Sequence, residues 1–120
     1  MHGLGELEAR VMDVLWRSSD VIRVRDVIDD LDDDRDLAYT TVMTVLDNLH
    51  KKGWVDRERN GRAYWYRATK SREEAAAEAM RALLDSTGDP NAVLLHFARN
   101  ASDTESKMLA RGLRQRGLKR

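Results

Sequence analysis

Residues 39–67 read YTTVMTVLDNLHKKGWVDRERNGRAYWYR, and this stretch decides the fold. In its first half apolar residues recur at helical spacing and a lysine pair precedes Gly53, so we expect a helix over about Tyr39–Lys52. In its second half Asn60-Gly61 separates two extended, aromatic-rich segments. Because Asn-Gly favours the tight turns of hairpins, we expect a two-stranded β-ribbon that turns at Asn60-Gly61.

The chain before this stretch carries two more amphipathic segments. Apolar residues spaced three and four apart predict helices over about Leu4–Ser18 and Val24–Leu31, and the short run Val21–Arg23 between them is compatible with a single strand. Three helices followed by a hairpin is the element order of a winged helix-turn-helix. We therefore expect residues 1–70 to form a winged-helix DNA-binding domain.

The chain after residue 70 is expected to be helical. Ser71 and Glu74 have the spacing of a capping box at the start of a helix. The sequence thus predicts a mainly α protein in which a three-helix region, residues 71–120, follows the winged helix. The three helices are expected over about Arg72–Ser86, Asn91–Asn100 and Thr104–Arg116.

These C-terminal helices have small apolar faces that would make a poor core by themselves. Pairing with a second copy would bury the faces, so we expect a homodimer that forms through this region. The alternative is that the helices pack on the N-terminal part of the same chain. The predicted dimerisation residues are Met80, Leu83, Leu84, Leu94, Leu95, Phe97, Met108, Leu109 and Leu113.

Composition excludes several classes of function. The chain has no run of 18 apolar residues and its start lacks the features of a secretory signal, so we expect a cytoplasmic protein without membrane insertion. It has no cysteine, its three histidines are isolated, and the acidic run from Asp30 to Asp36 fails as a calcium loop because Arg35 stands where glycine is needed. We therefore expect no metal, no cofactor and no enzymatic activity.

Charge is balanced overall, with 21 basic and 21 acidic side chains, but not locally. Residues 1–38 carry 5 basic against 11 acidic side chains, residues 39–70 carry 7 against 3, and residues 71–120 carry 9 against 7. The basic middle segment coincides with the predicted helix and hairpin, which favours a nucleic acid as partner. The acidic segment 1–38 is expected to lie away from the duplex.

The predicted helix over 39–52 turns short polar side chains away from its apolar stripe. Threonine offers a hydroxyl for a phosphate or base and a methyl for the methyl of thymine, and an asparagine can bind an adenine edge. The hairpin adds arginines, which bind phosphates well. The expected DNA-binding residues are Thr40, Thr41, Thr44, Asn48 and Lys51 of the helix and Arg59 and Arg62 of the hairpin, where Arg57 and Arg67 are also found.

Aromatic residues are expected to anchor these elements to one another. Tyr64 and Tyr66 share one face of their strand because side chains alternate, and we expect both to pack on the helices. Trp16 and Trp54 are expected in the core or at its rim.

Three strings carry a resemblance to a known family. They are Glu6-Leu7-Glu8-x-x-Val11-Met12-x-x-Leu15-Trp16, Tyr39-Thr40-Thr41-Val42-Met43-Thr44-Val45-Leu46-x-x-Leu49-x-Lys51-Lys52-Gly53 and Gly61-Arg62-Ala63-Tyr64-x-Tyr66. In this order they resemble the penicillinase and methicillin-resistance repressor family, which includes a copper-responsive branch. The match covers essentially the whole chain.

The resemblance implies a homodimer that binds an inverted-repeat operator in double-stranded DNA and blocks transcription, in a β-lactam-responsive or related stress system. In that family the helix matching Tyr39–Lys52 lies in the major groove, which implies DNA contacts for Thr40, Thr41 and Thr44. The family often has arginine where this chain has Asn48, and its absence removes a phosphate or guanine contact.

The resemblance also implies that proteolysis relieves repression. In the family a membrane-bound sensor metalloprotease causes cleavage in the C-terminal region, typically at an Asn-Phe bond; here Phe97 is kept, but His96 replaces the asparagine, so His96-Phe97 is the candidate site. The copper branch has a C-terminal cysteine cluster that this chain lacks. Two alternatives remain: a winged-helix regulator that responds to a small ligand, and a winged helix that binds proteins and no DNA.

Overall fold

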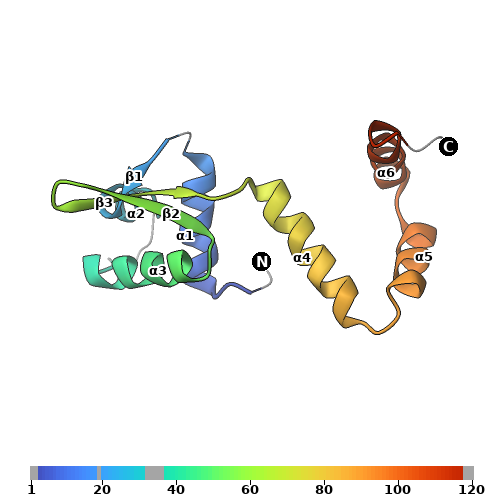
Figure 1. Ribbon diagram of the computed structural model, residues 1–120, viewed down its shortest axis with the longest axis horizontal. Coiled ribbons are helices and arrows are strands. Elements are labelled where there is room, and N and C mark those ends of the chain that lie inside the picture. Colours follow the sequence, from blue (N-terminus) through green and yellow to red (C-terminus); the bar gives the residue numbers. More distant parts are fainter. Residues whose placement is uncertain (1–2, 19, 32–36, 118–120) are drawn as a thin grey trace. The chain divides into compact units, whose positions relative to one another are not determined.

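The computed structural model describes residues 3–18, 20–31 and 37–117, which divide into two compact units, one ending at Ala79 and the other beginning at Met80. Figure 1 shows the elements in chain order. The first unit contains α1 (Glu6–Arg17), β1 (Ile22–Arg23), α2 (Val24–Leu31), α3 (Tyr39–Lys51), β2 (Val55–Asn60), β3 (Ala63–Ala68) and the start of α4 (Arg72–Ser86). The second unit contains the rest of α4, α5 (Pro90–Asn100) and α6 (Asp103–Gln115).

The predicted winged-helix fold is confirmed, with helix ends within two residues of those expected. The expected cap at the start of α4 is present, because the Glu74 N–H donates to Ser71 Oγ at 3.1 Å. The start of α6 has a similar cap, in which the Glu105 N–H donates to Ser102 Oγ at 3.1 Å. The acidic run considered as a calcium loop falls mainly on residues 32–36, which lie outside the described residues.

The strands form one antiparallel sheet in the order β1-β3-β2. The expected turn at Asn60-Gly61 is wrong by one residue: Asn60 pairs with Ala63 inside the ladder, and the loop consists of Gly61 and Arg62. Gly61 takes the left-handed backbone that the turn needs, with φ 68°. This register places Val55 opposite Ala68 against the core, which shows that burial at the strand ends overrides the local preference of Asn-Gly.

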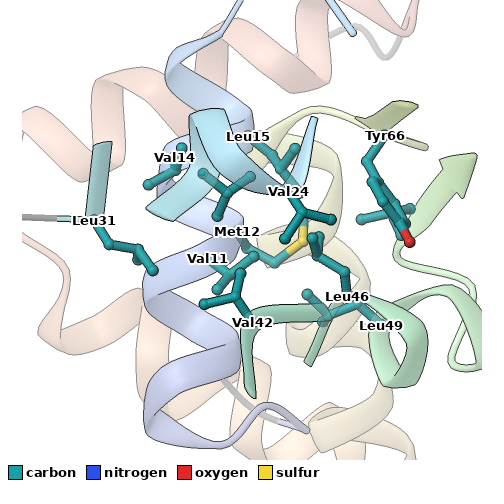
Figure 2. Close-up of a cluster of buried hydrophobic side chains, with 12 residues drawn as sticks. Val11, Met12, Val14, Leu15, Val24, Leu31, Val42, Leu46, Leu49 and Tyr66 are labelled. Atoms are coloured by element: carbon teal, nitrogen blue, oxygen red, sulfur yellow. The ribbon is translucent and has the colours of Figure 1, made fainter. Parts of the chain in front are cut away.

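The core of the first unit lies between α1, α2, α3 and one face of the sheet (Figure 2). Its largest fully buried side chains include Met12 from α1, Leu46 and Leu49 from α3, and Tyr66 from β3. Tyr66 therefore packs on the helices as expected. Tyr64 is less enclosed: it is 37% exposed and borders a hollow that is also lined by Val24 of α2 and Tyr39 of α3.

The two tryptophans lie at the rim of this core, as expected, with their rings 6.4 Å apart in an edge-on arrangement. Trp16 also holds the start of α4: its Nε1 donates to the Lys70 carbonyl at 3.1 Å, and the Arg72 guanidinium lies 5.0 Å from its ring. Ala75 in the next turn of α4 is buried. The first unit thus continues past residue 70. The assignment of DNA binding to residues 1–70 and of dimerisation to residues 71–120 stays a prediction.

The second unit differs because no described side chain between Met80 and Gly117 is buried. Large apolar side chains on all three of its helices are exposed to solvent in the isolated chain. Within the described part of the chain, no helix is both long enough and apolar enough to cross a membrane.

Candidate nucleic-acid interface

Helix α3 presents the polar face that the sequence predicts. Val42, Leu46 and Leu49 are completely buried, and this contact with the core turns the opposite side of the helix to solvent. The five predicted DNA-binding residues of the helix are all exposed: Thr40, Thr41, Thr44, Asn48 and Lys51. Their contact with DNA stays a prediction.

The hydroxyl of Thr44 is already engaged within the helix. Its Oγ1 donates to the Thr40 carbonyl at 2.9 Å, one turn earlier. The hydroxyl proton is therefore used, and what remains for a partner is an oxygen lone pair and the methyl group. Thr44 is suited to accept a hydrogen bond from a base amino group or to contact a thymine methyl, rather than to donate to a phosphate.

The arginines of the hairpin lie at different distances from its turn and on different faces of the sheet. Arg59 lies near the turn, where its Nε donates to the Gly61 carbonyl at 3.2 Å, and Arg62 is exposed in the turn itself. Arg67 does not belong with them: it pairs in the ladder with Asp56, at the end of β3 far from the turn and on the other face of the sheet from Arg57. The structure therefore leaves Arg59 and Arg62 as the arginines at the tip.

An ion-pair cluster joins α3 to the hairpin. The Asp47 carboxylate of α3 contacts Lys51 Nζ at 3.1 Å and Arg57 Nη1 at 3.0 Å. Hydrogen bonds from Lys51 and then from Arg57 hold the pKa of the Asp47 carboxyl below its usual value. Sequence reasoning missed Asp47: the spacing to Lys51 signals a helical pair, but the contact with Arg57 depends on the hairpin register.

A hollow beside the beginning of α3 also escaped prediction. It is bordered by Arg23 and Arg25, from the end of β1 and the start of α2, together with Tyr39 and Tyr64. The guanidinium of Arg23 lies 5.2 Å from the centre of the Trp65 ring and forms an ion pair with Asp26. Both arginines belong to the segment 1–38, which is acidic overall. Its overall acidity predicts that the whole segment lies away from DNA, but it does not show where these two basic side chains are.

The second unit carries the predicted dimerisation residues on its surface. Of these, Leu84 is half-buried and the others are exposed. Helices α5 and α6 border an apolar groove of about 820 Å³, lined among others by Leu94, Phe97, Met108, Leu109 and Leu113. His96 and Phe97, the candidate cleavage site, are exposed residues within α5.

Three helices, the third with an exposed polar face, followed by an arginine-tipped hairpin define a winged-helix DNA-binding protein. The model of the family described as penicillinase repressor matches residues 4–115. The chain therefore belongs to the penicillinase repressor family, a family of transcriptional repressors and not of enzymes.

Individual relatives agree with this assignment. The transcriptional regulator BlaI of Mycobacterium tuberculosis is 42% identical over 113 residues, which cover 92% of this chain and 82% of that relative. The solution structure of the DNA-binding domain of the repressor BlaI matches with a TM-score of 0.52 and 28% identity, over 60% of this chain and 87% of that domain. A MarR family protein from Bacillus stearothermophilus shares the fold, with a TM-score of 0.50 and 18% identity over 95% of this chain and 73% of its own.

Proposed function

We propose that the protein is a cytoplasmic repressor that binds an inverted-repeat operator as a homodimer. Each copy would insert α3 into the major groove of one half-site, with Thr40, Thr41, Thr44 and Asn48 toward the bases. Lys51, Arg59 and Arg62 would contact phosphates, which position a protein without reading sequence. The observation that carries the proposal is the exposed threonine face on a helix whose other side is fully buried.

The apolar surface of the second unit supports the homodimer. A segment of this size rarely holds a stable core without a partner, and here the large apolar side chains of α5 and α6 face solvent in the single chain. A two-fold pair would bury both copies of the α5–α6 groove in one self-complementary contact. Two weakly binding winged helices would then be linked, and linkage raises effective concentration sharply.

The same arrangement would allow regulation by proteolysis, which the family resemblance implies. Cleavage at His96-Phe97 would cut α5 in the middle of the dimerisation surface and uncouple two winged helices without altering either. The bond lies within a helix, so a protease needs that helix to unwind first. We expect a membrane-bound sensor metalloprotease pathway to supply the cut, in a β-lactam-responsive or related stress system.

Footprinting on the DNA upstream of the protein's own gene tests the proposal, together with sedimentation to measure the mass of free and bound protein. We expect a dimer that protects two symmetric half-sites separated by a whole number of helical turns, about 10 base pairs each. A monomer at micromolar concentration, or protein that protects no upstream sequence, would contradict it.

A further inference from the structure

Asp47 is an acidic residue in the middle of a face that is expected to approach a polyanion. It lies one helical turn before Lys51, and no other acidic residue occurs between Leu37 and Val55. Its two carboxylate oxygens are divided between two cations, with Oδ2 at 3.1 Å from Lys51 Nζ and Oδ1 at 3.0 Å from Arg57 Nη1. An acidic side chain does not increase the affinity of a surface for DNA. The position of Asp47 on this face therefore needs another explanation.

The two cations are held to different degrees. The side chain of Arg57 is 26% exposed and is contacted by Asp47 and by the Tyr64 ring, whose centre is 4.5 Å away. Tyr66 lies opposite Arg57 in the β-ladder. The side chain of Lys51 is 72% exposed and is paired with Asp47 alone among the described residues. Phosphate can therefore take Lys51 from Asp47 readily, whereas Arg57 is fixed against the hairpin.

We propose that Asp47 is a specificity-determining residue that lowers the affinity for non-operator DNA by holding Lys51 and Arg57 in ion pairs. The inference rests on the proposed function, because it assumes that α3 and the hairpin face the duplex. Non-specific affinity comes from cations that neutralise phosphates and release counterions. A cation that is already paired with a carboxylate neutralises phosphates less well and so releases fewer counterions from the DNA. The carboxylate itself also repels the nearby phosphate backbone of the DNA.

Operator DNA differs because base contacts compensate for the broken pairs. On the operator, the threonine face gains contacts with base edges, and this gain offsets the exchange of Lys51 from Asp47 to a phosphate. On random DNA no such gain occurs, so the ion pairs oppose binding without compensation. The cluster thus raises the ratio of specific to non-specific affinity rather than the affinity itself.

The decisive experiment replaces the carboxylate with an isosteric amide, Asp47→Asn, and measures binding to operator and random duplexes over a range of salt concentrations. We expect affinity for random DNA to rise about five- to tenfold at 0.1 M salt, and the slope of log K against log salt to steepen by about 1 to 2. Operator affinity should rise less, so that the specificity ratio falls. In an Arg57→Gln background, Asp47→Asn should steepen the slope by about 1 at most.

Asp56→Asn is the matched control. It makes the same change in net charge next to Arg57, but Asp56 is in β2, where it neighbours Arg57 along the strand and so lies on the opposite face of the sheet. The control should leave random-DNA affinity within about twofold of the wild type. An equal rise in both variants would mean that net charge alone acts, and the inference would be overturned.

Other outcomes are equally decisive. Unchanged affinity and salt slope in Asp47→Asn, with wild-type protein still binding its operator, would refute the role of Asp47 and leave the proposed function intact. A loss of operator affinity with no change on random DNA would show that Asp47 reads a base, such as the amino group of cytosine. If the wild-type protein bound no DNA, the proposed function would itself fail.

Discussion

The two units of this chain differ in what holds them together. The first has a continuous core in which helices and sheet bury twelve side chains, whereas the second, from Met80 onward, buries none among its described residues. The surface that would read DNA is therefore built on a preformed scaffold. In the proposed homodimer, the surface of the second unit would be completed by the second copy, and we expect its folding to be coupled to association.

Under the proposed function, this difference would explain how the protein can be switched. The first unit has its own core, and recognition groups are held best by such rigid elements. A unit that depends on its partner is sensitive to any change that weakens pairing, including a single cut. In the proposed mechanism, the sensitivity to cleavage would thus be confined to the second unit, and the first unit would read the DNA sequence.

Breaking the second unit should have the largest effect. Leu109→Asp puts a charge in the apolar groove between α5 and α6, where the partner would have to bury it. We expect monomers in sedimentation and a loss of operator affinity of about 10²- to 10⁴-fold. In the full-length variant the first unit should retain its fold, as measured by circular dichroism.

Arg111→Asp is the control for this change. Arg111 lies on the same helix but does not line the groove, and its replacement alters the charge more than Leu109→Asp does. The control should remain dimeric. If both variants became monomeric, or neither did, the groove would not be the dimer interface.

Truncation in the two units should separate their stabilities. Leu46→Ala removes a completely buried side chain and should lower the free energy of unfolding of the first unit by about 2–5 kcal/mol, as measured by urea denaturation. Leu95→Ala, at a 56% exposed position of α5, should leave that transition unchanged while weakening association. If Leu46→Ala and Leu95→Ala shifted the unfolding transition of the first unit equally, the two units would unfold together. That result would contradict the difference in stability between them.

The sequence predicts the first unit well because periodicity reports burial directly. The stripe of Val42, Leu46 and Leu49 located α3 and, by exclusion, its exposed threonines. Local rules were weaker in the hairpin, where the register of Val55 and Tyr66 against the core moved the turn one residue past the favoured Asn-Gly. Turn preference is a local energy, and the core contacts that outweighed it are not visible in a window of four residues.

Contacts between elements were the part that could not be predicted. Asp47 and Arg57 meet because α3 and the hairpin pack at one particular register, and nothing in their spacing of ten residues indicates it. The arginines of the hollow, Arg23 and Arg25, were obscured by the acidity of the segment around them. The charge of a whole segment does not indicate where its individual arginines lie.

Single contacts within the reading unit should have smaller effects, which distinguish its helix from its hairpin. Thr44→Ala removes the methyl and the acceptor lone pairs that α3 offers, so operator affinity should fall about tenfold, within the range for a base contact, with random DNA little affected. Arg62→Ala should weaken binding to both DNAs and lower the salt slope by about 1. Gel-shift titrations at several salt concentrations measure both. Equal losses on the two DNAs for Thr44→Ala would mean that α3 is not the reader.

The smallest effect should be an acid dependence that belongs to the first unit alone. Glu8 accepts hydrogen bonds from the Gly5 N–H and from Lys52, each at 2.8 Å, and these bonds lower the pKa of the Glu8 carboxyl. A lowered pKa means that the carboxylate stabilises the fold above its unfolded-state pKa, near 4.5, and that this contribution disappears as pH falls through the folded-state value. Glu8→Gln should therefore lower stability at pH 7 by no more than about 1 kcal/mol and should flatten the loss of stability between pH 5 and pH 3, by about the same amount. Urea midpoints of the two proteins across this range measure the difference, and parallel pH profiles would show that Glu8 is not the source. Because Glu8 joins the start of α1 to the end of α3, the result also reports how firmly the reading helix is fixed to its scaffold.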